Sequence, residues 1–240
     1  MSEFSTEELF DAVDRSVVEL LARHGIEEPP VDAIQLVQEA FRYTVTYEEE
    51  DEEDPQYGDS PKRKRPRELV MKQSQSPGGQ QMMAARACAK EMAPAILQKL
   101  GVVPGTEQKS ANTQLMGVIA PRLLLPTRWF ESAARRANSD LLRIQETFDT
   151  VNLEPIALRL LELEDPCVIA IVDDGVVGLR RSNAMQATKK LTPAEEYCIE
   201  KVIAAEEPQT VRKEGWTSRG WPVNTGPFNR ILLRSVPDDV

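Results

Sequence analysis

Residues 84–97 read AARACAKEMAPAIL, and this stretch decides how the chain around it is interpreted. Its alanines, interspersed with Met, Ile and Leu, favour a helix that buries one face. The preceding SQSPGGQQ is typical of a turn that leads into a helix. We expect this helix to run to about Leu100, with Pro94 inside it or at a kink. The stretch has one carboxylate, Glu91, and no histidine, so it is either a core helix or an active-site helix that has lost its site.

Composition excludes several classes of function. Hydrophobic residues make up 41% of the 240 residues, enough for a packed core. A net charge of -10 disfavours a basic face, so direct nucleic-acid binding is not expected. The single histidine argues against common zinc sites and most neutral-pH acid–base catalysis. Three separated cysteines, no long apolar run and no signal-peptide pattern predict a cytoplasmic protein outside membranes.

The segment before residue 84 predicts two helices and two strands. Ser5 and Glu8 have capping-box spacing, and His24 falls in the last turn of the resulting helix, where we expect it to act as a solvated cap residue. Asp32 is the expected cap of a second helix. The segments 42–48 and 68–73 are strand candidates. Between them lie an acidic block (48–54) and a basic block (61–67), which predict a charged loop at about 48–67.

The segment after residue 100 predicts helices and then strands. A helix from 112 to 126 and three shorter ones precede two apolar runs around Asp174-Gly175, a strong hairpin signal. Thr192, Pro193 and Glu195 mark the start of a further capped helix, and strands follow it. The predicted class is α+β, with residues 1–190 as the main domain and 191–240 as a helix and strand extension packed on it.

Several stretches, in order, resemble the ImmA/IrrE family of metallopeptidase-like regulatory proteins. They are LLARHGIEEPPVDAIQLVQEAF (20–41), residues 84–97 in place of the zinc helix, MGVIAPRLLLP (116–126), FDTVNLEPIALRLLEL (148–163) and the hairpin VIAIVDDGVVGLRRSN (168–183). The resemblance implies a helical zincin-like core with small antiparallel sheet elements. It also implies zinc in active members, whose substrate is typically a DNA-binding repressor.

The departures from the family fall on the chemistry. A HExxH helix places two imidazoles on one face, so that both reach one zinc ion. In one alignment, Lys90 and Pro94 occupy the ligand positions and Glu91 keeps the place of the general base. In the other alignment, Arg86 and Lys90 occupy them. The family's third ligand falls near Thr113. All ligands are therefore lost in either register, and no metal or other cofactor is expected.

Other residues of this region have simpler interpretations. Cys88 could act as a nucleophile, but buried hydrophobic packing is the expectation because no base lies near it in sequence. Glu91 is expected to be partly buried and paired with a neighbouring cation such as Arg86 or Lys90. Because an adjacent residue cannot face Glu91 along the helix, Arg86 or a residue from another helix is the better candidate. The three tryptophans could line a groove, although core or edge packing is the more common role.

The resemblance and its departures lead to one functional hypothesis. The chain is expected to be a catalytically degenerate ImmA/IrrE-like protein, retained as a regulatory or protein-binding module for a repressor or toxin-like partner. The alternative is an active metal-dependent peptidase with non-standard ligands, such as Glu91 with acidic residues from other segments.

Overall fold

The computed structural model describes residues 5–48, 67–102, 108–223 and 229–238. The chain forms two compact units. The first contains residues 1–132 and 146–152, and the second contains residues 133–145 and 153–240. The charged loop predicted at about 48–67 lies, apart from its two end residues, outside the described part of the chain. No helix among the described residues is both long enough and apolar enough to cross a bilayer.

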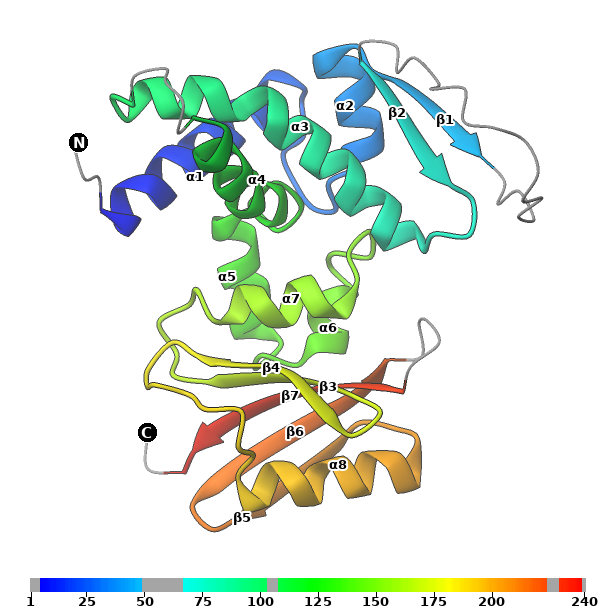
Figure 1. Cartoon of the computed structure of the whole chain (residues 1–240), viewed down its shortest axis with the longest axis vertical. Coiled ribbons are helices and arrows are strands. Elements are labelled where there is room, and N and C mark those ends of the chain that lie inside the picture. The colour runs from blue at the N-terminus through cyan, green and yellow to red at the C-terminus, as the bar shows by residue number, and fades with distance from the viewer. Residues whose placement is uncertain (1–4, 49–66, 103–107, 224–228, 239–240) are drawn as a thin grey trace. The chain divides into compact units, whose positions relative to one another are not determined.

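The first unit is mainly helical (Figure 1). Its elements are α1 (Thr6–Arg23), α2 (Ala33–Phe41), β1 (Thr44–Glu48), β2 (Glu68–Lys72), α3 (Pro77–Lys99), α4 (Gln108–Leu124) and the start of α5 (Thr127–Arg136). α3 packs against both α2 and α4 and forms the centre of this unit. The stretch 84–97 is therefore a core helix of the first unit.

Local capping signals explain where the first helices begin and end. Ser5 and Glu8 form the predicted capping box of α1, and His24 is its C-cap residue, as expected. Gly25 follows with a positive φ of 69°, a conformation that favours glycine after a helix. The Asp32 side chain accepts hydrogen bonds from two backbone amides at the start of α2. α4 begins at Gln108, four residues before the predicted Asn112.

The strands of the first unit differ from the expected antiparallel arrangement. β1 and β2 are parallel, with Thr44 opposite Glu68 and Glu48 opposite Lys72. Their segments were predicted as strands, but the prediction of small antiparallel sheet elements is wrong for this pair. Parallel strands cannot be joined by a tight two-residue turn, and 19 residues separate Glu48 from Glu68 in the sequence.

The second unit contains a five-stranded antiparallel sheet with the order β4-β3-β7-β6-β5. Its elements after α5 are α6 (Leu141–Gln145), α7 (Leu153–Leu160), β3 (Val168–Asp173), β4 (Val176–Ser182), α8 (Pro193–Ala205), β5 (Gln209–Lys213), β6 (Trp216–Val223) and β7 (Arg230–Pro237). The predicted hairpin turns at Asp174-Gly175, which both have positive φ. The α+β class is confirmed, and its antiparallel sheet is larger than expected.

The predicted boundary at residue 190 does not coincide with the division between the two units. β3 pairs with β7, so the hairpin assigned to the main domain and the strands assigned to the extension belong to one sheet. Figure 1 shows α8 along one face of this sheet and α7 along the other. On the α8 face, a hydrophobic cluster joins strand and helix residues: Ala170, Val172, Cys198, Ile199, Val202, Val211, Ile231 and Leu233.

Candidate functional site

α3 has a nearly continuous buried surface and a single exposed stripe. Ser76 caps the helix by accepting a hydrogen bond from the Gly79 amide, and Pro77 occupies the first turn. Ten residues of the helix are buried: Gln81, Ala84, Ala85, Ala87, Cys88, Ala89, Met92, Ala93, Ile96 and Leu97. The many alanines allow α2 and α4 to approach α3 closely.

The exposed stripe contains the positions where zinc ligands would lie in both alignments. Arg86, Lys90 and Pro94 follow one another at intervals of four residues, and all are exposed. Side chains at this spacing share one face of a helix. A guanidinium, an ammonium and a proline ring offer no lone pair to a metal ion at neutral pH, and the two cations repel it. These residues do not fit zinc.

The remaining metal-ligand chemistry gives the same result. The position expected for the third ligand carries Thr113, an exposed hydroxyl residue on α4. Among the described residues, no group of three or more His, Cys, Asp or Glu side chains could hold a metal ion. Within the described part of the chain, these side chains therefore provide no ligand set for a metal ion.

Glu91 is held by residues from outside α3. The Tyr43 hydroxyl, just before β1, donates a hydrogen bond to Glu91 Oε1 at 2.9 Å. A guanidinium nitrogen of Arg67, just before β2, lies 3.9 Å from Glu91 Oε2. About a quarter of the Glu91 side chain is exposed (25%), as expected for a partly buried carboxylate. The expected pairing with Arg86 or Lys90 is wrong, because both lie on the exposed stripe and the β1–β2 segments bring Tyr43 and Arg67 to Glu91.

The phenol of Tyr43 is part of this small network. Burial of the ring, the hydrogen bond to Glu91 and the Glu91 charge together raise the pKa of Tyr43 to about 12. The hydroxyl therefore keeps its proton at neutral pH and remains a donor. Glu91 accepts that hydrogen bond and faces the Arg67 charge, an arrangement that stabilises the joint between α3 and the β1–β2 pair.

Cys88 is unsuited to nucleophilic chemistry. Its side chain is fully buried. Burial is the largest cause that raises the pKa of the Cys88 thiol to about 12, so the reactive thiolate is scarce at neutral pH. Burial also raises the thiol pKa values of Cys167 and Cys198. Hydrophobic packing is thus the role that the structure gives to Cys88, as expected from the sequence.

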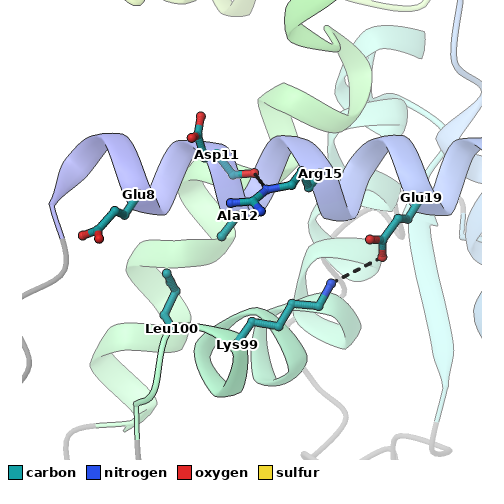
Figure 2. A pocket seen from close by; sticks show the side chains of 7 residues that line it. All are labelled: Glu8, Asp11, Ala12, Arg15, Glu19, Lys99 and Leu100. Carbon is teal, nitrogen blue, oxygen red and sulfur yellow. Dashed lines mark hydrogen bonds and ion pairs between the residues drawn. The ribbon is translucent and has the colours of Figure 1, made fainter.

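A charged groove lies between α1 and the end of α3 (Figure 2). Its volume is about 540 Å³, and its lining residues are Glu8, Asp11, Ala12, Arg15, Glu19, Lys99 and Leu100. Lys99 Nζ lies 3.3 Å from Glu19 Oε2, and Arg15 Nε donates to the Asp11 carbonyl oxygen at 3.2 Å. Both cations of the groove thus have partners within the chain, and the groove is a solvated ion-pair surface. Sequence reasoning singled out none of these residues as a site.

Comparison with known proteins identifies a shared fold. No family model and no curated protein matches the sequence. A solved structure of a Mycobacterium tuberculosis transcriptional regulator is similar, with a TM-score of 0.64 and 18% sequence identity. The match covers 97% of this chain and 76% of that chain. At this level of identity the likeness concerns the fold alone.

Proposed function

We propose that this chain is a catalytically degenerate ImmA/IrrE-like protein that acts as a regulatory, protein-binding module in the cytoplasm. The observation that carries the proposal is the exposed stripe of α3. Arg86, Lys90 and Pro94, which the resemblance aligns with the two possible pairs of ligand positions, are all exposed there. We infer that α3 holds the place of a zinc helix and has lost its ligands.

The second support comes from Glu91. In the register that preserves a glutamate, this side chain occupies the place of the general base. Here its carboxylate accepts the Tyr43 hydrogen bond and lies near Arg67. A general base must have a lone pair directed at a reacting proton, and an engaged carboxylate meets this need less well. The arrangement favours a structural use of Glu91.

The proposed partner is a DNA-binding repressor or a toxin-like protein, bound without being cut. The resemblance to the ImmA/IrrE family suggests this class of partner, and a structural neighbour bears the name of a transcriptional regulator. Direct DNA binding by this chain is not part of the proposal, because a net charge of -10 opposes association with phosphates.

Restoring the lost ligands tests the resemblance. Lys90→His with Pro94→His recreates H-E-x-x-H around Glu91, and Thr113→Glu adds the third ligand. The matched control is a His pair at the same spacing on α8, Glu196→His with Glu200→His, where both positions are exposed. Since a third ligand and a preformed site add affinity, we expect the triple variant to bind Zn²⁺ at least about tenfold more tightly than the control in calorimetry.

The other register is tested in parallel by Arg86→His with Lys90→His and Ala87→Glu. If neither set binds Zn²⁺ more tightly than the α8 pair, the assignment of α3 as a former zinc helix is wrong.

Metal analysis of the native protein separates the proposal from its alternative. Protein purified without chelator is expected to contain only substoichiometric metal. A stoichiometric Mg²⁺, Mn²⁺, Ca²⁺ or Zn²⁺ ion would support an active metal-dependent peptidase with non-standard ligands.

A binding experiment tests the proposed partner. The same preparation, mixed with a helix-turn-helix or toxin-like protein encoded beside its gene, is expected to form a complex, and mass spectrometry is expected to show that the partner is intact. Cleavage of that protein would overturn the proposal.

A further inference from the structure

A second groove of the first unit has an apolar interior. It lies between the C-terminal half of α1 with the loop that follows it and the start of α5, and its volume is about 480 Å³. Its lining residues are Asp14, Val17, Val18, Leu21, Ala22, Ile26, Glu27, Pro126, Thr127, Arg128, Trp129 and Glu131. All of them belong to the first unit. We call it the α1–α5 groove.

Apolar side chains line the α1–α5 groove at helical spacing. Val17 and Leu21 are buried, while Val18 between them exposes 58% of its surface. Trp129, half-buried on α5, contributes an aromatic side chain to the lining. Val18 is therefore an exposed aliphatic residue beside a concave surface, where removal from water stabilises a bound partner. The sequence favoured core or edge packing for the tryptophans, and Trp129 instead lines a groove.

Acidic groups predominate among the charges of the α1–α5 groove. Asp14 Oδ1 lies 3.3 Å from Arg122 Nε, and the Arg122 guanidinium stacks 3.7 Å above the Phe10 ring, so the Asp14 charge is balanced within the unit. Glu27 and Glu131 are exposed acids, and Arg128 is the exposed base of the lining. With a net charge of -10 over the chain, this groove attracts a positively charged segment.

The groove's walls determine the kind of segment that fits. Both α1 and α5 are helices, whose main-chain groups are largely used within the helix, so these walls offer side-chain contacts rather than strand pairing. An occupant must present apolar side chains at intervals that match the exposed Val18 and Ala22, one helical turn apart. An amphipathic helix with anchors at i, i+3 or i+4, and i+7 provides this spacing.

We propose that the α1–α5 groove binds an amphipathic helix of a partner protein, with an apolar face flanked by Lys or Arg. This inference rests on the proposed function for one point only, namely that the chain binds a protein partner. It names the chemistry of that partner and places its docking surface on α1 and α5.

A synthetic helix of about 14 residues, with Leu on one face and Lys on the other, serves as the probe. Fluorescence anisotropy of the labelled peptide measures its binding to the full chain. The variant Val18→Lys removes the exposed apolar contact and adds a repelling charge, on a solvent-facing helix position where lysine has good helix propensity. The matched control is Ile203→Lys on α8, which has nearly the same exposure, 60% against 58%, and changes the net charge equally.

We expect Val18→Lys to weaken peptide binding at least about tenfold and Ile203→Lys to leave it nearly unchanged. A Leu/Glu peptide of the same pattern is expected to bind at least about tenfold more weakly than the Leu/Lys peptide. Glu131→Lys, a second variant, should weaken binding by a smaller factor and reduce its salt dependence. Circular dichroism of each variant verifies that it is folded.

Three outcomes overturn the inference. Equal weakening by Val18→Lys and Ile203→Lys would mean general attraction to an acidic protein. Equal binding of the Leu/Glu peptide would remove the role of charge. Self-association of the chain that Val18→Lys abolishes, measured by sedimentation, would identify a second copy as the occupant. None of these outcomes changes the metal analysis or the zinc affinity of the histidine variants, so failure of this inference is distinguishable from failure of the proposed function.

Discussion

Glu91 of α3 and Glu195 of α8 show how differently one residue type can be used on two helices. Glu195 has no exposed surface and closes the capping box by accepting from the Thr192 amide at 2.7 Å. Its two carboxylate oxygens share the single Nε–H of Arg180, at 3.1 and 3.2 Å from Nε. Glu91 is a quarter exposed and has looser partners, Tyr43 at 2.9 Å and Arg67 at 3.9 Å. The Glu195 carboxylate is buried and held by hydrogen bonds, whereas the Glu91 carboxylate lies beside the exposed stripe of α3. From this difference in burial we expect Glu195 to contribute more than Glu91 to the free energy of unfolding.

The largest expected effect comes from Glu195→Ala. The side chain of Arg180 is only 6% exposed, so the substitution leaves a nearly buried guanidinium without its carboxylate. Loss of one member of a buried ion pair costs about 3–5 kcal/mol of unfolding free energy. The neighbouring exposed Glu196→Ala, the control, should change stability by less than about 0.5 kcal/mol. Urea unfolding followed by circular dichroism measures both, and similar values for the two would remove the distinction drawn for Glu195.

Gly220→Ala tests how closely α8 packs on the sheet. A Cβ at this position would lie 2.8 Å from Val202 Cγ2 and 3.1 Å from Cys198 Sγ, both on α8. Overpacking of this kind costs about 1–3 kcal/mol. The control is Gly117→Ala on α4, where a Cβ meets nothing within 4 Å. There alanine should stabilise the helix by about 0.5–1 kcal/mol. Equal effects of the two substitutions in the same urea unfolding assay would show that α8 can shift to accommodate the methyl group.

Glu91→Ala is expected to have a smaller effect, about 1 kcal/mol, because it removes a charge-assisted hydrogen bond from a partly exposed pair. It should also lower the pKa of Tyr43 from about 12, although not to its ordinary value, since burial is the largest cause of the shift. Ultraviolet absorbance of tyrosinate, compared with the Tyr43→Phe variant, measures this pKa. An unchanged pKa would mean that Glu91 does not face the phenol.

The same residue gives a pH dependence. Because the pKa of Tyr43 is raised on folding, from 10.0 to about 12, its contribution is fully present below pH 10 and is lost as the pH rises from about 10 to about 12. Comparison of the unfolding free energies of the native protein and Tyr43→Phe across this window measures the loss. If the two curves stay parallel, Tyr43 titrates normally in the folded protein.

The smallest effect is expected for Arg67→Gln. Arg67 is largely exposed and lies 3.9 Å from Glu91, so the ion pair should contribute no more than about 0.5 kcal/mol. Arg86→Gln, on the exposed stripe, is the matched control and should behave similarly. A cost for Arg67→Gln as large as that of Glu91→Ala would show that the ion pair, rather than the Tyr43 hydrogen bond, is the stronger interaction of Glu91.

Glu91 and Glu195 also show which contacts could be predicted from the sequence. The capping box of Glu195 was predictable because Thr192 and Pro193 lie next to it, and the hairpin was predictable from Asp174-Gly175. That Arg180 would pair with Glu195 could not be predicted, because this contact depends on how the β3–β4 hairpin pairs with the rest of the sheet. Local sequence patterns do not determine that pairing. The partners of Glu91 were predicted wrongly for the same reason.

Non-local pairing also limited the prediction of domains and of the α1–α5 groove. The segments of β3 and β7 were both recognised as strands, but nothing in either indicates that they are adjacent. A boundary near residue 190 followed from the extent of the family resemblance. Trp129 had no sequence signal that distinguishes a groove from a core, because that difference depends on how α5 lies against α1.

The division of the chain into two units limits how either unit can be transferred by gene fusion or recombination. The backbone passes from one unit to the other at 132/133, 145/146 and 152/153. A gene cut after residue 132 would deprive the first unit of Phe148, which is fully buried and packs against Phe130 in a tilted arrangement with ring centroids 6.1 Å apart. It would also remove Asn152, whose amide nitrogen donates to Ser76 at the cap of α3. A gene fusion or domain exchange with a single junction therefore cannot transfer either unit whole, and transfer of one unit alone needs a junction at each of the three crossings.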